Sequence, residues 1–263
     1  MADYALTLSD SEIERYRLMA DAAERRERDL WVAAGAVPGA RIADVGCGPG
    51  AIAVRLAGMA APDGAVWAVD RDGDALAVAS ALAARTGVPV HTVGGSAAAT
   101  GLAEGTFDLV MLRHVLAHNG GREQAIVDHL GTLARPGGAV YLVDVDLSSS
   151  GLRHAPPEFD EMDDRYRELH RRRGNDLTVG TRLDELLTAA GLEVVTFEGH
   201  IDVFAPPPGM RGPVWAARDT LVAEGLATPG DIARWDDAFR RAEHTASGRR
   251  FFAANFIAVG RRP

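Results

Sequence analysis

Short apolar runs alternate with longer amphipathic segments along most of the chain. The runs, each short enough to form one strand, are residues 42–45, 65–69, 88–93, 107–110, 139–145, 192–203 and 250–259. Segments of helical periodicity lie between them, such as Ala51–Ala61 after the first run and Thr181–Ala190 before the sixth. Strands that alternate with helices favour a mostly parallel sheet with helices on both faces. The pattern therefore predicts an α/β fold.

Three stretches interrupt this alternation. In residues 1–35, Ser9 and Glu12 have the spacing of a capping box, and apolar residues then recur at helical intervals. The other two stretches, 147–175 and 205–248, follow the fifth and sixth strands. We expect one domain, 1–263, with a helical cap (1–35), a core and two helical lid insertions. The core is expected at residues 36–146, 176–204 and 249–263.

The two insertions predict a ligand pocket. Both emerge beside the carboxyl ends of strands, which is where open α/β sheets bind ligands. In the first insertion, Ser148–Ser150 indicates a loop, and a helix is expected from Glu158 to about Arg172. Its apolar stripe includes Phe159, Met162 and Tyr166. This stripe could line the pocket or belong to the core, and the sequence leaves both alternatives open.

The turn after the first strand carries the candidate ligand chemistry. Asp44 ends the strand, and Gly46, Gly48 and Gly50 alternate before the helix that begins at Ala51. Such a turn brings bare backbone against a nucleoside, and it also fits the permissive dinucleotide fingerprint. A pyrophosphate would be repelled by the Asp44 carboxylate. S-adenosylmethionine (SAM) carries an ammonium and a sulfonium, so the carboxylate favours SAM.

The pattern D-x-G-x-G-x-G over residues 44–50 resembles motif I of the class I SAM-dependent methyltransferases. The resemblance extends over residues 41–146 and includes Asp70, 22 residues after Gly48, the segment 94–97, the strand that begins Phe107-Asp108-Leu109-Val110, and the turn at 133–138. It implies a Rossmann-like seven-stranded sheet of order 3-2-1-4-5-7-6 whose last strand is antiparallel. Ser96 stands where this family commonly has an aspartate that contacts adenine.

The resemblance also implies the roles of individual residues. Asp44, Gly46, Gly48 and Gly50 would hold the methionine part of SAM, with Cys47 as a small buried filler inside the turn. Asp70 would hold the ribose. Arg71, Ser96 and Ala97 would surround the adenine. Arg113 would lie beside the reactive centre through its backbone. N-terminal helices close over the cofactor in related enzymes, which makes Tyr4 and Tyr16 candidate pocket residues, although a helix packed flat on the sheet fits the sequence equally well.

Three further residues are candidates for contact with the methyl acceptor. His118 lies just beyond the fourth strand and is the first candidate for a general base, and His154 in the first insertion is the second. His114 fits a structural role better. Asp144, at the end of the fifth strand, could orient the acceptor or be an ordinary solvated acid. No set of acidic residues resembles the magnesium site of catechol-type enzymes, so we expect no metal.

Composition restricts the partners. The chain has 263 residues, a formal net charge of −9 and one cysteine, Cys47, which excludes internal disulfides. The acidic balance argues against a nucleic-acid substrate, since phosphate contacts normally require a basic surface. No apolar run approaches the ~20 residues of a membrane span, and the N-terminus has no signal-peptide pattern. We expect a cytoplasmic protein that is a monomer or a homodimer.

The resulting hypothesis is a methyltransferase that acts on a small organic acceptor. The core resembles the branch that includes ubiquinone, sterol and many secondary-metabolite methyltransferases, and secondary metabolism is the expected setting. Oxygen is the first choice of accepting atom, nitrogen the second and carbon the third. Two alternatives stay open: a SAM-binding protein of the same fold without transferase activity, and a nicotinamide-dependent dehydrogenase.

Overall fold

A single seven-stranded sheet organises the computed structural model, which describes residues 8–207, 209–243 and 249–263. The strand order is β3-β2-β1-β4-β5-β7-β6, and only β7 runs antiparallel to its neighbours. This confirms the fold class and the strand order implied by the sequence. The strands are β1 (Arg41–Val45), β2 (Ala65–Asp70), β3 (Val90–Gly94), β4 (Phe107–Arg113), β5 (Ala134–Arg153), β6 (Glu193–Phe204) and β7 (Arg250–Arg261).

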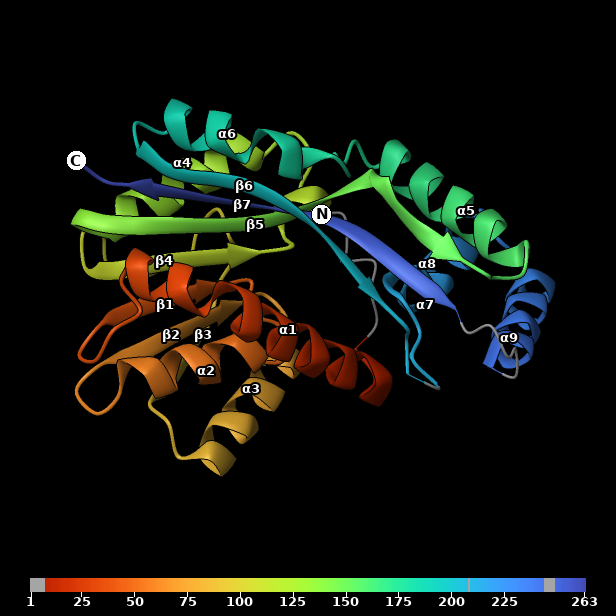
Figure 1. The fold of residues 1–263 in the computed structure, drawn as a ribbon, viewed down its shortest axis with the longest axis horizontal. Coiled ribbons are helices and arrows are strands. Elements are labelled where there is room, and N and C mark those ends of the chain that lie inside the picture. Colours follow the sequence, from red (N-terminus) through yellow and green to blue (C-terminus); the bar gives the residue numbers. More distant parts are fainter. Residues whose placement is uncertain (1–7, 208, 244–248) are drawn as a thin grey trace.

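Helices cover both faces of the sheet, with α1, α2 and α3 on one face and α4 and α6 on the other (Figure 1). The helices of the core are α1 (Asp10–Ala34), α2 (Ala51–Ala60), α3 (Gly73–Thr86), α4 (Glu123–Leu133) and α6 (Leu183–Ala189). The 3₁₀ turns η1 (Leu116–His118) and η2 (Val179–Arg182) precede α4 and α6. Strands β1 and β4 are buried on both faces, as their continuous apolar runs predict.

The N-terminal helix α1 has two different halves. Ser9 caps its start by accepting from the Glu12 N–H, which confirms one half of the expected capping box, whereas the Glu12 side chain pairs with Arg15 instead. The C-terminal half packs on the sheet through Trp31 and Ala34. The N-terminal half extends beyond the sheet (Figure 1). Both alternatives, a flat helix and a cap, are therefore partly right.

Strand β5 runs farther than the sequence predicts. It leaves its parallel partner β4 near Val143 and continues to Arg153, paired only with β7. Ser148–Ser150 is therefore not a loop but part of an irregularity in the strand. Asp146 accepts from the Ser148 N–H and hydroxyl, while the Ser150 hydroxyl accepts from Ala254 N–H. The serine-rich sequence predicted a loop, but in the structure these polar contacts hold a bulge within the strand.

The extension formed by β5, β7 and β6 supports the helices of both insertions (Figure 1). These helices are α5 (Glu158–Arg172), α7 (Pro213–Ala216), α8 (Arg218–Ala223) and α9 (Pro229–Glu243). The expected helix over 158–172 is confirmed. In the second insertion, two short helices, α7 and α8, follow each other closely along residues 213–223. Buried residues of the insertions, including Phe159, Trp235 and Phe239, form an apolar cluster of their own. Within the described residues, no helix has the length and hydrophobicity needed to span a bilayer.

Candidate active site

The glycine-rich turn between β1 and α2 is fastened to β2 by its backbone. The N–H groups of Gly46 and Cys47 both donate to the carbonyl of Val69, at 2.8 and 3.0 Å. Gly46 has a φ of 70°, and a Cβ there would lie 2.5 Å from a methyl carbon of Val115. Only glycine fits this position without strain. The turn thus presents backbone, rather than side chains, to the space beside it.

The rest of the turn is enclosed by neighbouring elements. Gly50 precedes the first residue of α2, and Gly48 lies under the ring of Tyr16, where a Cβ would be 3.6 Å from a ring carbon. Cys47 is buried, and burial raises the pKa of its thiol well above the usual range. The thiol is therefore inert filler, as the sequence predicts. Helix α1 forms a wall over the turn.

Asp44 is the most unusual group of the site. Its side chain is 3% exposed, and its Oδ2 has no hydrogen-bond partner among the described residues. Desolvation raises the pKa of this carboxyl to about 7, although Arg113 acts in the opposite direction. A buried carboxylate oxygen without a partner is costly unless a cation or donor reaches it. The position thus fits the ammonium of an amino-acid ligand.

Asp70, at the end of β2, ties the turn to the adjacent strand. One carboxylate oxygen accepts from the Gly48 N–H at 2.8 Å, and the other accepts from the Asp72 N–H at 3.0 Å. A carboxylate has about four acceptor positions, so two remain for a pair of hydroxyl groups. Arg71 and Ser96, which are exposed, line the same cavity together with Ala97.

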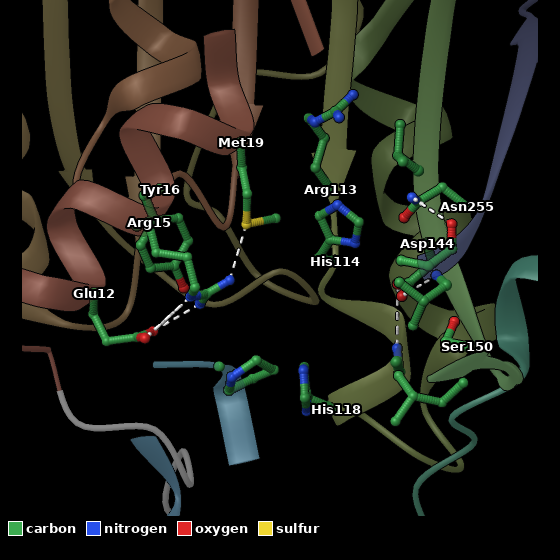
Figure 2. A pocket seen from close by; sticks show the side chains of 18 of the residues that line it. Glu12, Arg15, Tyr16, Met19, Arg113, His114, His118, Asp144, Ser150 and Asn255 are labelled. Atoms are coloured by element: carbon green, nitrogen blue, oxygen red, sulfur yellow. Dashed lines mark hydrogen bonds and ion pairs between the residues drawn. The ribbon is translucent and has the colours of Figure 1, made fainter. Parts of the chain in front are cut away.

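One cavity of about 1240 Å³ connects this turn with the insertions. Single-ligand pockets usually measure about 300–1,000 Å³, so this space can hold more than one small molecule. Figure 2 shows Arg15, Tyr16 and Met19 of α1 on one side and Arg113 and His114 between the two walls. Side chains of β5 and β7, among them Asp144, form the opposite wall.

Phe159, Met162 and Tyr166 of α5 line the cavity and are almost fully buried. They also pack against α9, so the two alternatives for this apolar stripe are both correct. Tyr16 likewise lines the cavity. Tyr4 lies outside the described residues.

The side chain of Arg113 has a role that the sequence did not predict, since only a backbone contact with the cofactor was expected. Its guanidinium pairs with the buried carboxylate of Glu27 in α1, with one N···O distance of 3.0 Å. Glu27 also accepts from Tyr141 Oη at 2.9 Å and from Trp31 Nε1 at 3.2 Å. Glu27 lowers the energy of the buried Arg113 charge, and its own pKa is held below the usual range despite burial. This network anchors α1 to β4 and β5, and the sequence analysis missed Glu27.

Of the three histidines considered in the sequence analysis, two line the cavity and one does not. His114 and His118 line the cavity, and desolvation lowers the pKa of each to about 3. The His118 ring lies 5.0 Å from that of His170, a buried histidine of α5. His154 is exposed in the turn between β5 and α5 and does not line the cavity. The choice of His154 as a catalytic base therefore has no geometric support, because the residue is exposed and lies outside the cavity lining.

Asp144 is not a solvated acid, because its carboxylate is buried and hydrogen-bonded. It is 1% exposed, and one oxygen accepts from the N–H groups of Leu116 and Ala117 while the other accepts from Val145 N–H. Desolvation raises its pKa to about 6, and hydrogen bonds from four backbone N–H groups, those three and Val115, limit that rise. Asp144 thus holds η1, and with it His118, against β5. Asp144 also lines the cavity, so its contact with the acceptor stays a prediction.

Comparison with known families identifies the core. Residues 42–138 match the family model described as a methyltransferase domain. The sheet order with its antiparallel last strand is the arrangement that the class I resemblance implied. Residues 42–138 carry a methyltransferase domain. SAM is the cofactor of this family, and the buried, unpartnered Asp44 oxygen fits its ammonium.

Individual relatives agree with this assignment. The chain is 37% identical over 119 residues to a ubiquinone biosynthesis O-methyltransferase of Burkholderia ambifaria (strain MC40-6), a match that covers 42% of this chain and 47% of the relative. It is similar in fold to a SAM-dependent methyltransferase from Aquifex aeolicus, with 17% identity, a TM-score of 0.53 and coverage of 72% and 92% of the two chains. A geranyl diphosphate methyltransferase in complex with SAM has 14% identity and a TM-score of 0.55, covering 96% of this chain and 89% of its own. The sequence match spans less than half the curated relative, so it concerns the methyltransferase domain alone.

Proposed function

We propose that this protein transfers a methyl group from SAM to a small organic acceptor inside the cavity. The observation that carries the proposal is the continuity of the cavity, which extends from the Asp44 turn to the apolar residues of α5. A cofactor pocket that opened directly to solvent would suit a large substrate. Here the neighbouring space is enclosed by α1 on one side and the insertions on the other, which suits a small one.

The cofactor is expected to lie along the carboxyl ends of β1 and β2. Asp44 would accept from the ammonium, and the exposed backbone at Gly46 and Gly48 would let the methionine part approach. The free acceptor positions of Asp70 would take the ribose hydroxyls. Ser96 would contact the adenine with a hydroxyl, which can both donate and accept. When bound, SAM supplies an activated methyl group with a good leaving group.

The residues of this chain then have to align the acceptor and exclude water. Alignment alone can account for about 7–11 kcal/mol of the barrier in favourable cases. For an oxygen acceptor we place the hydroxyl against His118, whose ring is neutral at pH 7 because desolvation lowers its pKa to about 3. The same shift makes the ring a weak base, and the negative charge that develops on the acceptor oxygen has to raise that pKa for the proton to move. His118 would then accept the hydroxyl proton of the acceptor, and SAM, when bound, would supply the methyl group to the acceptor oxygen.

The test uses SAM with a radiolabelled methyl group, the purified protein and fractionated small-molecule extracts. Label in a low-mass product, absent with Asp70→Ala, supports the proposal. Label confined to protein or RNA overturns the choice of acceptor. Binding of SAM without any transfer favours the alternative of a SAM-binding protein that lacks transferase activity.

The role of His118 has a separate test. His118→Gln is expected to reduce kcat at least about a hundredfold for an oxygen acceptor, the usual minimum for a general base. His154→Gln is the matched control and should leave kcat unchanged, because His154 lies outside the cavity lining. Equal activity of wild type and His118→Gln would remove His118 as the base.

A further inference from the structure

Two arginines lie at the end of the cavity that is formed by the insertions. Arg211 precedes α7, and Arg249 precedes β7. Both line the cavity, and both stack on the ring of Phe239, with guanidinium carbons 4.1 and 5.5 Å from the ring centre. The guanidinium carbon of Arg249 also lies 5.7 Å from the ring centre of Phe159. Two cations thus converge in an aromatic pocket at the opposite end from the Asp44 turn.

Arg249 forms no direct ion pair with a carboxylate in the part of the chain that the structure describes, although Glu243 acts on its charge. It is only 6% exposed, and its contacts there are with the rings of Phe159 and Phe239. Desolvation lowers its pKa, the Glu243 carboxylate opposes this shift, and the repulsion of Arg211 adds to it. A ring face attracts the cation, but it leaves most of the five N–H donors of a guanidinium unsatisfied.

Arg211 is paired on one side only. Its Nη2 lies 3.0 Å from Asp236, a carboxylate that also binds Arg240. Its Nη1 is buried and has no hydrogen-bond partner among the described residues. Desolvation lowers the pKa of Arg211 as well. The two arginines therefore share one ring, and among the described residues Arg211 has a buried donor without an acceptor.

Burying such donors is unfavourable unless an acceptor reaches them, and a buried cation is more costly still. The cavity itself is the space into which an acceptor can enter. A planar guanidinium binds carboxylate or phosphate oxygens in a bidentate manner, which would satisfy the donors that the rings cannot. The aromatic side chains around the arginines would then contact an apolar body.

We propose that Arg211 and Arg249 form an anion subsite that binds a carboxylate or phosphate group on an otherwise apolar methyl acceptor. The inference rests on the proposed function in one respect, namely that the bound anion is part of the acceptor. Holding the anionic group at this end directs the other end of the molecule toward the Asp44 turn. The subsite would thus select anionic acceptors and fix which atom faces the cofactor.

The test measures binding of small aromatic probes to the full chain saturated with S-adenosylhomocysteine (SAH), by calorimetry. Benzoate and phenyl phosphate represent the two anions, and benzamide is the neutral control of similar shape. We expect at least one anion to bind about tenfold or more tightly than benzamide, as charged hydrogen bonds predict. Arg249→Gln and Arg211→Gln should each remove that preference while SAH affinity stays unchanged.

Arg218→Gln is the matched control, because Arg218 also stacks on an aromatic ring, Trp215, but does not line the cavity. It should retain the preference for the anion. Equal binding of benzoate, phenyl phosphate and benzamide to wild type, or an unchanged preference in Arg249→Gln, would overturn the subsite. Unchanged SAH affinity in the variants shows that they fold. If SAH fails to bind wild type, the proposed function fails, and the same probes added without SAH still decide the subsite.

Discussion

Cofactor affinity should depend on pH through one buried group, Asp44. The free protein holds this carboxyl with a pKa of about 7 because it is desolvated, whereas the bound ammonium requires the ionised form. About half of the molecules are ionised at pH 7, about a tenth at pH 6 and about a hundredth at pH 5. SAH affinity should therefore rise about fiftyfold from pH 5 to pH 7. The rise stops near pH 8, where the ammonium itself begins to lose its proton.

Calorimetric titration with SAH measures this directly, because SAH has the ammonium of SAM but no sulfonium. Repeating the titration in buffers of different ionisation enthalpy counts the protons released, which should be about one per SAH at pH 5.5 and about a half at pH 7. Asp144 titrates near pH 6 as well, so Asp44→Asn is the essential comparison. Asp44→Asn should bind SAH more weakly at pH 7 and with a nearly flat profile from pH 5 to 7.

An equal pH slope in wild type and Asp44→Asn would refute the reasoning. The raised pKa of Asp44 makes the stability of the cofactor-free protein fall with rising pH, whereas it makes SAH affinity rise. Because the folded protein holds the proton more tightly than the unfolded chain, Asp44 stabilises the cofactor-free protein below about pH 4. That contribution is lost as the pH rises through 7. Saturating SAH should remove this loss.

Three further predictions concern individual contacts. Asp70→Ala should weaken SAH binding at least about tenfold in calorimetry, since one charged hydrogen-bond acceptor is lost; unchanged affinity would contradict the ribose assignment. Glu27→Gln should lower the free energy of unfolding in urea by about 3–5 kcal/mol, because it breaks a buried ion pair, whereas Glu14→Gln in an exposed pair should have no measurable effect. Gly46→Ala should lower stability by about 1–3 kcal/mol, and adding Val115→Ala should recover part of it; a fully stable Gly46→Ala would exclude the clash.

The features that sequence predicted are those set by short-range pattern. The turn at Gly46–Gly50 is specified by its own glycines, and the acids Asp44 and Asp70 lie at strand ends that hydrophobic runs mark. The order of strands followed from the resemblance to a family. The turn and the two acids are determined by residues that are close together in the chain, whereas the strand order came from the resemblance alone.

What sequence could not predict depends on contacts between distant segments. Glu27 has the same surroundings in the chain as the exposed acids of α1, and only Arg113, 86 residues away, explains its burial. Ser148–Ser150 has the composition of a loop, but β7 supplies partners that keep it in a strand. Arg249 and Arg211 converge on the ring of Phe239, which α9 supplies. A signal for Glu27 did exist, since it lies on the same helical stripe as Trp31.

The long ladder of β5, β7 and β6 has a consequence for how such proteins diverge. The family match ends at residue 138, near the beginning of β5, and the insertions lie on the part of the ladder beyond it. Backbone hydrogen bonds hold most of that extension, and the side chains of Asp146, Ser148 and Ser150 hold its bulge. Mutations can therefore accumulate in the insertions, and new acceptors can be recruited, while the turn at Asp44 stays under separate selection. The most variable part of the sequence would then be the part that records what each descendant methylates.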